Sequence, residues 1–183
     1  MSTQPEITFR VATLEDASAI RSFIESAFRA SDPRTSWTAD EKLNQGFTLA
    51  LSQVESIITK PNSAFIIAET LSSALVGTIG TFRRPDGLGR LAMLAVDQSL
   101  QRAGLGRRVL EKGEEYCRAV LGVKKVGLDA LSSRAALIEW YERRGYVRTG
   151  ERVPFPAEGR DGADEGLYFV QFEKEIGGEL EAK

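Results

Sequence analysis

The sequence predicts one α/β domain in which apolar strands alternate with amphipathic helices. The chain has 183 residues, of which 42% are apolar and 27% are charged, a composition typical of a single soluble domain with a full core. Apolar residues recur at every second position in some stretches and at every third or fourth position in others, which are the periods of strands and helices. The two patterns meet in Leu91–Leu110, where a strand is expected to lead through a glycine-containing loop into a helix.

The N-terminal third is expected to contain one strand and two helices. Apolar and polar residues alternate in Ile7–Val11, as they do in a half-buried strand. Thr13 and Asp16 form a capping box for a helix whose apolar face extends over Ile20–Phe28. A second helix is expected over Ala39–Thr59, because apolar residues recur along one side of it.

The middle of the chain favours three consecutive strands. Phe65–Ala68 is continuously apolar, which indicates a strand covered on both faces, and Leu75–Phe82 is its expected hairpin partner. Leu88–Val96 is again apolar on both faces. We therefore expect this third strand at the centre of a sheet, with helices packed on either side.

The C-terminal half predicts two helices and three further strands. The helix after the glycine loop is expected to face the core through Leu105, Val109, Gly113, Cys117 and Val120. A second helix, Arg134–Arg144, ends on arginines followed by Gly145, which suits a helix C-terminus. The strands are expected at Lys125–Leu131, Tyr146–Val153 and Leu167–Glu175.

Charge and cysteine content narrow the class of protein. The formal net charge is -2, which provides no overall field for binding nucleic acid or an anionic membrane. The single cysteine, Cys117, cannot form an internal disulfide, which favours a reducing intracellular compartment. No stretch approaches the ~18 apolar residues of a membrane span, and the N-terminus lacks the layout of a signal peptide. We expect a cytoplasmic protein, with the nucleus as the alternative.

Gly104 and Gly106 lie in a turn at the start of a predicted helix. Such a turn leaves backbone N–H groups without helical partners at the positive end of the helix dipole, where anions bind. The missing Cβ atoms let a phosphate approach the backbone closely, and Arg102, Arg107 and Arg108 add positive charge. The sequence therefore predicts a pyrophosphate site in this loop.

The spacing of the loop distinguishes between phosphate-binding motifs. A nucleoside-triphosphate loop needs Lys followed by Ser or Thr after its second glycine, whereas Gly106 precedes Arg107. A dinucleotide fingerprint needs a third glycine, and Val109 occupies that position. The remaining pattern, Gln101-x-x-Gly104-x-Gly106, resembles the acyl-CoA-binding motif of the GNAT superfamily of N-acetyltransferases.

A second segment strengthens this resemblance, which extends over about residues 6–176. Leu137–Glu151, with the sequence LIEWYERRGYVRTGE, is similar to the family's helix–Tyr–Gly–strand segment, at a fitting interval from the glycine loop. The resemblance implies a mixed, mostly antiparallel sheet of about seven strands with helices on both faces. It also implies that the strand before the loop and Lys125–Leu131 lie side by side and splay apart to admit acyl-CoA.

The same resemblance implies an N-acetyltransferase that transfers the acetyl group of acetyl-CoA to a primary amine by direct attack. Acetyl-CoA is the expected co-substrate, and no metal is expected. The backbone of Leu94, Ala95 and Val96 is expected to pair with the pantetheine arm like an added strand. The pyrophosphate is expected to be wrapped by Gln101, Arg102, Ala103, Gly104, Leu105, Gly106 and Arg107.

Two groups of the expected active site act on the thioester. The resemblance implies that a backbone N–H near Leu94 stabilises the oxyanion, because a break in strand pairing would free it at that position. Tyr141 matches the family position whose hydroxyl faces the CoA sulfur and protonates it. An ordinary core tyrosine is the alternative reading, since Leu137, Ile138 and Tyr141 share one helix face.

The chain contains no histidine, so the proton acceptor is expected to be a carboxylate, a water chain to a carboxylate, or bulk solvent. Asp129 is the first candidate and Glu69 the second, and either could instead be a solvated charge at a strand edge or turn. Many family members have Asn seven residues before the active-site Tyr, whereas this chain has Arg134. The side-chain contact to the pantetheine amide is therefore expected to differ, while the main-chain contacts are unaffected.

The sequence leaves the acceptor open. The resemblance implies that its pocket is built by Arg29–Thr38 and Pro154–Gly166, where Arg34 and Trp37 would hold a flat or anionic group or else pack beneath a loop. Small-molecule amines, peptides and proteins are all candidates, and a homodimer is one option for assembly. The alternatives to an enzyme are a catalytically silent acyl-CoA sensor with the same fold and a scaffold that binds no CoA. The presence of Tyr141 and of the complete loop favours the enzyme.

Overall fold

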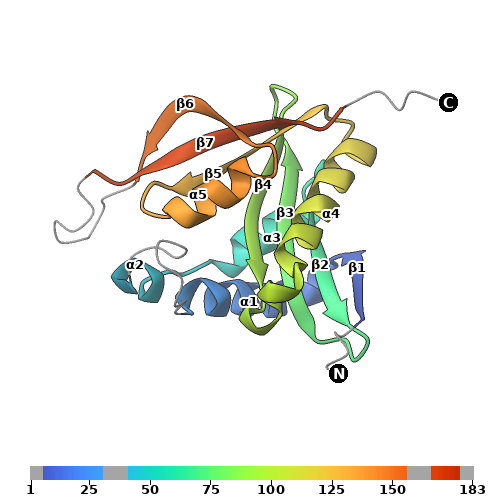
Figure 1. Cartoon of the computed structure of the whole chain (residues 1–183). Helices are drawn as coiled ribbons and strands as arrows, with labels where there is room; N and C mark the ends of the chain where they lie inside the picture. Colours follow the sequence, from blue (N-terminus) through green and yellow to red (C-terminus); the bar gives the residue numbers. More distant parts are fainter. Residues whose placement is uncertain (1–5, 31–40, 156–165, 178–183) are drawn as a thin grey trace.

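The computed structural model describes residues 6–30, 41–155 and 166–177, with residues 41, 42 and 101–103 described only by their backbone. Within these ranges, seven strands form one sheet in the order β1-β2-β3-β4-β5-β7-β6 (Figure 1). They are β1 Ile7–Val11, β2 Ser63–Thr70, β3 Leu75–Arg83, β4 Gly89–Val96, β5 Lys125–Leu131, β6 Val147–Pro154 and β7 Tyr168–Glu175. Neighbouring strands are antiparallel except for β4 and β5, which are parallel. The mixed, mostly antiparallel sheet is therefore confirmed.

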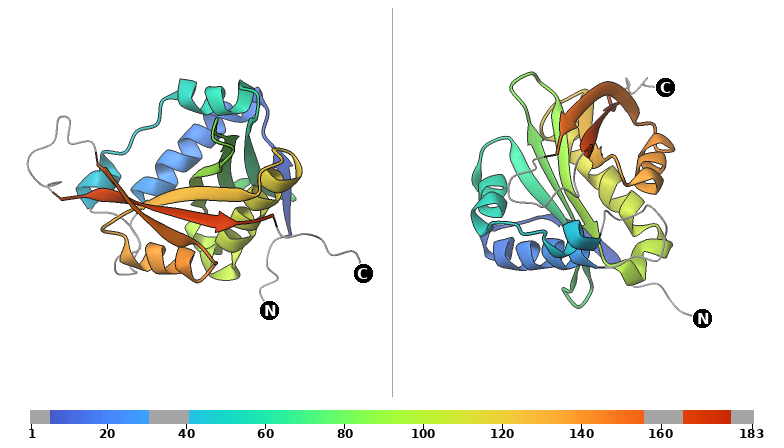
Figure 2. Two further views of the ribbon diagram at one scale, coloured as in Figure 1. Left: turned by 90° about the horizontal axis from the view of Figure 1, so that it is seen from above. Right: turned by 90° about the vertical axis from the view of Figure 1, so that its left-hand side faces the viewer.

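Helices cover both faces of this sheet (Figure 2). They are α1 Ala17–Arg29, α2 Glu41–Gln45, α3 Leu51–Thr59, α4 Leu105–Ala119 and α5 Ala135–Glu142. On one face, Ile20, Ile24 and Val54 from α1 and α3 form a hydrophobic cluster with Phe65 and Ile67 of β2. A second cluster joins α4 and α5 to the opposite face. None of the helices in the described ranges has the length and apolarity that a membrane crossing requires.

Helix α4 lies close against β3 because glycines leave room for its approach. A Cβ at Gly113 would lie 2.8 Å from Ile79 Cδ1, and a Cβ at Gly77 would lie 2.8 Å from Val109 Cγ2. Both distances are shorter than side chains tolerate, so the two glycines fix the position of α4 on the sheet. The expected core face of α4 is confirmed except at Val120, which is 62% exposed because the helix ends one residue earlier.

The single helix expected over Ala39–Thr59 is wrong, because the described part of this stretch forms two helices, α2 and α3. Between them the Phe47 ring stacks on Phe28 of α1, with centroids 4.7 Å apart. The Leu49 N–H donates to the Glu25 carboxylate at 2.9 Å. Contacts with a distant part of the chain thus outweigh the helical period here.

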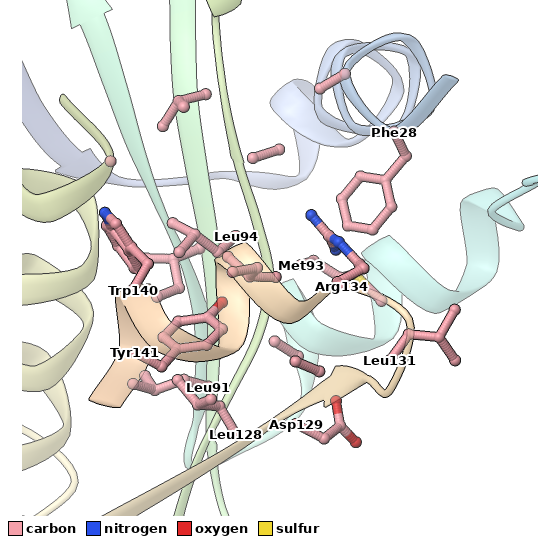
Figure 3. A pocket seen from close by; sticks show the side chains of 18 of the residues that line it. Phe28, Leu91, Met93, Leu94, Leu128, Asp129, Leu131, Arg134, Trp140 and Tyr141 are labelled. Carbon is pink, nitrogen blue, oxygen red and sulfur yellow. The ribbon is translucent and has the colours of Figure 1, made fainter. Parts of the chain in front are cut away.

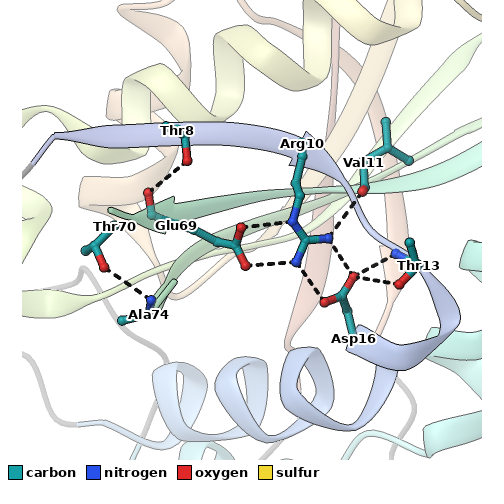
Figure 4. Close-up of polar contacts among 8 residues, drawn as sticks. All are labelled: Thr8, Arg10, Val11, Thr13, Asp16, Glu69, Thr70 and Ala74. Atoms are coloured by element: carbon teal, nitrogen blue, oxygen red, sulfur yellow. Dashed lines mark hydrogen bonds and ion pairs between the residues drawn. The ribbon is translucent and has the colours of Figure 1, made fainter. Parts of the chain in front are cut away.

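Arg10 ties β1 to β2 and to the turn that begins α1 (Figure 4). Its Nη1 donates to Asp16 Oδ2 at 2.8 Å, and its Nε donates to Glu69 Oε2 at 2.9 Å. The hydrogen bonds from Arg10 lower the pKa of Asp16 to about 2. Asp16 also accepts from the Thr13 N–H at 2.7 Å, so the predicted capping box is confirmed.

Strands β4 and β5 pair only at their beginnings and then diverge. Their register joins Gly89 to Val126 and Arg90 to Gly127. Strand β5 pairs with β7 along its whole length and turns away from β4, as Figure 1 shows. The sheet therefore contains the splay that the sequence resemblance implied.

Candidate active site

A pocket of about 340 Å³ lies where β4 and β5 diverge (Figure 3). Residues of β4 and β5 line its middle, residues of α1 and α2 line one end, and residues of α4 and α5 line the other. Because α1 and α4 cover opposite faces of the sheet, the pocket reaches from one face to the other at the divergence. Two ligands that enter from opposite faces can meet at the divergence.

A β-bulge interrupts the pairing of β3 with β4 at the pocket wall. The register shifts between Thr78, which pairs with Ala95, and Gly80, which pairs with Ala92. Met93, inside this interval, has a φ of 54°, which is unusual for a residue with a side chain. The Thr78 hydroxyl donates to the Met93 carbonyl oxygen at 3.1 Å. A bulge leaves an extra residue without a ladder partner, so the expected break in strand pairing next to Leu94 is present.

The β4 edge that faces the gap carries backbone groups without a strand partner on that side. Leu94, Ala95 and Val96 all line the pocket, beyond the last position at which β4 pairs with β5. An extended ligand that contains amide groups fits such an edge, because it can form the hydrogen bonds of a missing strand. The pantetheine arm of CoA, with its two amides, is a ligand of this kind.

The glycine loop opens onto the same pocket. Gly104 is the N-cap of α4 with a φ of 75°, and a Cβ there would meet nothing within 4 Å. Gly106 lines the pocket, and a Cβ there would lie 3.7 Å from Trp140 Cζ2. The open space above the loop and the free N–H groups of the first helical turn fit a pyrophosphate. Arg107 is exposed and forms an ion pair with Glu111 at 3.3 Å.

Other residues predicted for this loop contribute in different ways. Gln101, Arg102 and Ala103 end a short 3-10 helix, Gln98–Ala103, and their side chains lie outside the described structure. Leu105 is 2% exposed, so its side chain belongs to the core and only its backbone can face a phosphate. As far as it is described, the loop therefore offers backbone groups rather than side chains to a ligand.

Tyr141 combines a core ring with a hydroxyl at the pocket wall. The residue is 6% exposed, and its ring lies 5.2 Å from Trp140, 5.7 Å from Tyr146 and 6.1 Å from Phe172. Its hydroxyl points toward Leu94 across the pocket (Figure 3). Burial raises the pKa of Tyr141 to about 12, so the phenol is protonated at neutral pH. The two sequence readings of Tyr141 are thus compatible with each other.

The two candidate proton acceptors lie in different places. Asp129 lines the pocket, where its Oδ2 accepts from Arg90 Nη2 and, at 3.4 Å, from Gln171 Nε2. Glu69 is instead bound by Arg10 at the far side of β2 and is not among the described residues that line the pocket. Arg90 is the single charge within an otherwise apolar strand, and it was not among the site residues predicted from the sequence.

The end of the pocket near α1 has aromatic walls that the sequence did not reveal. Phe28 stacks on Phe47, and Phe155 lies 5.6 Å from Phe169 between ring centroids. Arg134, the N-cap of α5, reaches toward Phe28 in Figure 3. The acceptor residues proposed from the sequence, Arg34 and Trp37, lie outside the described residues. Among the described residues, no three His, Cys, Asp or Glu side chains form a group that could hold a metal ion.

Sequence and fold both relate this chain to known acetyltransferases. The S-(2-succino)cysteine N-acetyltransferase of Bacillus subtilis (strain 168) is 29% identical over 153 residues, which cover 79% of this chain and 86% of that protein. The structure of the ribosomal-protein-S18-alanine N-acetyltransferase from Escherichia coli superposes with a TM-score of 0.69 at 20% identity, covering 97% of this chain and 99% of its own.

Mutant forms of the spermidine/spermine N-acetyltransferase from Vibrio cholerae superpose with a TM-score of 0.66 at 15% identity, covering 93% of this chain and 94% of their own. These structural similarities concern the fold. The profile of the acetyltransferase (GNAT) family matches residues 19–146, the region that contains the glycine loop, the splayed strands and Tyr141. This chain therefore belongs to the acetyltransferase (GNAT) family.

Proposed function

We propose that this protein transfers the acetyl group of acetyl-CoA to the primary amine of a small molecule. The observation that carries the proposal is the pocket in the β4–β5 gap, where the glycine loop, the open β4 edge and the Tyr141 hydroxyl meet. The names of the Bacillus and Vibrio relatives, which specify a cysteine derivative and polyamines, support a small acceptor. The name of the Escherichia coli enzyme specifies a protein alanine, so a peptide amine is the alternative acceptor.

The donor side of the pocket suits acetyl-CoA, which supplies the activated acetyl group as a thioester. In this proposal the backbone of Leu94, Ala95 and Val96 binds the pantetheine amides. The N–H groups around Gly104 and Gly106 bind the pyrophosphate, with help from the dipole of α4. Arg107 is exposed and ion-paired with Glu111, which supports binding of the pyrophosphate by backbone groups rather than by side chains.

Tyr141 is the proposed general acid. When the amine nitrogen bonds to the acetyl carbonyl carbon, the bond between that carbon and sulfur breaks, and the departing thiolate needs a proton. Tyr141 can supply it, because its raised pKa keeps the phenol protonated at every physiological pH. The Leu94 N–H, next to the bulge, is the proposed donor to the oxyanion that precedes the bond cleavage.

Asp129 is the proposed acceptor for the proton that the attacking amine loses, either directly or through water. Its position in the pocket supports this role. Its ion pair with Arg90 favours a second candidate function, because a carboxylate held by a guanidinium has fewer lone pairs available for an amine. In that case the protein is an acyl-CoA sensor that binds acetyl-CoA without transferring the acetyl group.

An amine screen separates the enzyme from the sensor. The purified chain is incubated with acetyl-CoA and amines of several classes, and products are detected by mass spectrometry while calorimetry follows acetyl-CoA binding. The enzyme gives an acetylated product at a rate that falls in the Tyr141→Phe variant. Binding without any acetylated product would identify the sensor, and the absence of binding would contradict both.

A further inference from the structure

The part of the pocket near α1, here called the acceptor end, has mostly apolar walls. The glycine loop belongs to the other end of the pocket, near α4, so the acceptor rather than the donor is expected near α1. The apolar side chains of the acceptor end come from α1, the segment after α2, the bulge, and the neighbouring ends of β5, β6 and β7: Phe28, Phe47, Met93, Leu131, Phe155 and Phe169.

The charged and amide residues of the described lining already have partners within the protein. Asp129 forms an ion pair with Arg90. Asn44, Gln98 and Arg134 have interaction partners of their own. As far as the lining is described, the pocket therefore offers a substituent of the acceptor apolar contacts more readily than a new ion pair.

The phenylalanine rings of the acceptor end are only partly buried. Phe28 stacks on Phe47 with centroids 4.7 Å apart, and the centroids of Phe155 and Phe169 are 5.6 Å apart. All four residues keep part of their surface exposed, whereas Phe65 in the core is 0% exposed. A ligand that covers such apolar surface in a concave site gains binding free energy, because both partners leave water. The rings thus suit an apolar group of the acceptor.

This apolar surface lies away from the reaction centre. In Figure 3, Phe28 and Tyr141 lie on opposite sides of the pocket, with Met93 between them. An amine nitrogen at the divergence of β4 and β5 can therefore be joined by a short chain to a group that contacts Phe28. The pocket volume of about 340 Å³, which the acyl donor shares, limits the acceptor to a small molecule.

A second ammonium group on the acceptor would be unfavourable at the acceptor end. It would lose its hydration there, and the carboxylate in the described lining, that of Asp129, is already held by Arg90. An alkyl or phenyl group has no such desolvation cost. The walls therefore favour a monoamine over a polyamine.

We propose that the acceptor is a small primary monoamine with an alkyl or aralkyl substituent, and that Phe28 and Phe47 bind this substituent. The inference rests on the proposed acetyl transfer and specifies the class of its acceptor. It implies that kcat/KM increases with the apolar surface of the amine and decreases when the far end of the chain carries a charge.

The first test uses the wild type with acetyl-CoA and saturated amines of increasing length, and kcat/KM is expressed per concentration of unprotonated amine groups. From ethylamine to n-pentylamine, each added methylene should raise kcat/KM about threefold to fourfold. The comparison of n-pentylamine with 1,5-diaminopentane keeps the chain length and adds a charge at the far end. We expect the monoamine to be preferred about tenfold or more.

The second test removes the proposed binding surface. Phe28→Ala and Phe47→Ala should each lower the ratio of kcat/KM for 2-phenylethylamine to kcat/KM for ethylamine about tenfold, with little change in the KM for acetyl-CoA. Phe28→Leu, which keeps more of the packing of α1, should lower the ratio by a smaller factor. Phe23→Ala is the matched control, because Phe23 is also a partly buried residue of α1 in the same hydrophobic cluster but is not among the described residues that line the pocket. This variant should keep the wild-type ratio.

Several results would contradict the proposal. Equal rates along the alkylamine series, or a preference for 1,5-diaminopentane or L-phenylalanine over the matching monoamine, would overturn the acceptor class while leaving acetyl transfer intact. An unchanged ratio in Phe28→Leu together with a raised KM for acetyl-CoA would assign Phe28 to the donor and overturn its proposed role. If no amine of any class is acetylated, the proposed function itself fails.

Discussion

The Thr78 hydroxyl donates to the Met93 carbonyl oxygen at 3.1 Å and so stabilises the bulge that interrupts β4 at the pocket wall. Thr78 is completely buried, and so is Thr81 on the same strand, whose hydroxyl donates to the Ala64 carbonyl oxygen at 3.2 Å. The two threonines therefore share burial and bonding, but only Thr78 contacts the bulge. This difference makes it possible to separate the stability of β3 from the geometry of the oxyanion donor.

Thr78→Val should lower both stability and turnover. The valine leaves the Met93 carbonyl without its donor, which should cost about 1–2 kcal/mol of unfolding free energy. Because the bulge orients the Leu94 backbone, we also expect kcat to fall on the order of tenfold, with little change in the KM for acetyl-CoA. Thr81→Val should show a comparable loss in urea unfolding but keep kcat. Equal turnover in the two variants would mean that the bulge takes no part in the mechanism.

Gly104 offers a test of the pyrophosphate site that separates charge from backbone strain. Asn and Asp have nearly the same shape, and both tolerate a positive φ better than other residues with a side chain. A side chain at Gly104 meets nothing within 4 Å, so both variants should fold, as circular dichroism can verify. Calorimetry should show acetyl-CoA binding weakened at least tenfold more by Gly104→Asp than by Gly104→Asn. Similar affinities in the two variants would mean that phosphate binds elsewhere.

Tyr141→Phe tests the general acid while keeping the ring that packs against Trp140, Tyr146 and Phe172. A thiolate can leave partly unaided, so turnover should fall on the order of 10²-fold rather than vanish. Acetyl-CoA affinity and melting temperature should be nearly unchanged, because the phenylalanine keeps the ring contacts with these three residues. Turnover at the wild-type rate would return Tyr141 to a purely structural role.

The same phenol makes stability depend on alkaline pH. In the unfolded chain Tyr141 ionises near its ordinary pKa of ~10, whereas in the folded protein its pKa is about 12. The contribution of the protonated Tyr141 phenol to the stability of the folded state is complete below pH ~10. From there toward pH ~12 the unfolding free energy falls by up to ~1.4 kcal/mol per pH unit. Urea unfolding at pH 9 and pH 11 should show a smaller decrease for Tyr141→Phe than for the wild type. Identical decreases would mean that the folded phenol ionises as easily as the free one.

Asp129→Asn and Arg90→Gln together test the proton acceptor. Both substitutions break the ion pair, but only the first removes the carboxylate. If Asp129 accepts the proton, kcat should fall on the order of 10²-fold in Asp129→Asn and much less in Arg90→Gln, measured with saturating amine. Equal losses in the two variants would indicate that the pair acts only by joining β4 to β5.

Local patterns predicted most of the fold, and long-range contacts account for what they missed. The strand periods of Ile7–Val11 and the apolar run in β2 depend on neighbours in the sequence, so they were read correctly. The break between α2 and α3 depends on Phe28 and Phe47, which stack on each other although they lie far apart in the sequence, and no local period encodes such a contact. Tertiary packing commonly overrides helical propensity in this way.

The residues of the candidate site likewise fall into two groups, those that local motifs indicate and those that only the fold brings together. The glycine loop and Tyr141 lie in contiguous motifs, which is why the sequence indicates them. The Arg90–Asp129 pair joins residues 39 positions apart, and its formation depends on the β4–β5 register. Arg134 was noticed as a departure from the family pattern, but its direction toward Phe28 follows from the turn between β5 and α5. A residue's type can thus be read from the sequence when its orientation cannot.

Strands β4 and β5 share two register positions, so the two parts of the sheet are hydrogen-bonded at one end of the gap and separate at the other. One part of the sheet consists of β1 to β4, and the other consists of β5, β7 and β6. Within each part, neighbouring strands are hydrogen-bonded to one another. A molecule bound along the open edge of β4 can form the backbone hydrogen bonds that the sheet lacks there. Acetyl-CoA would then stabilise the junction between the two parts of the sheet as well as react there. Release of CoA after every turnover would remove that stabilisation.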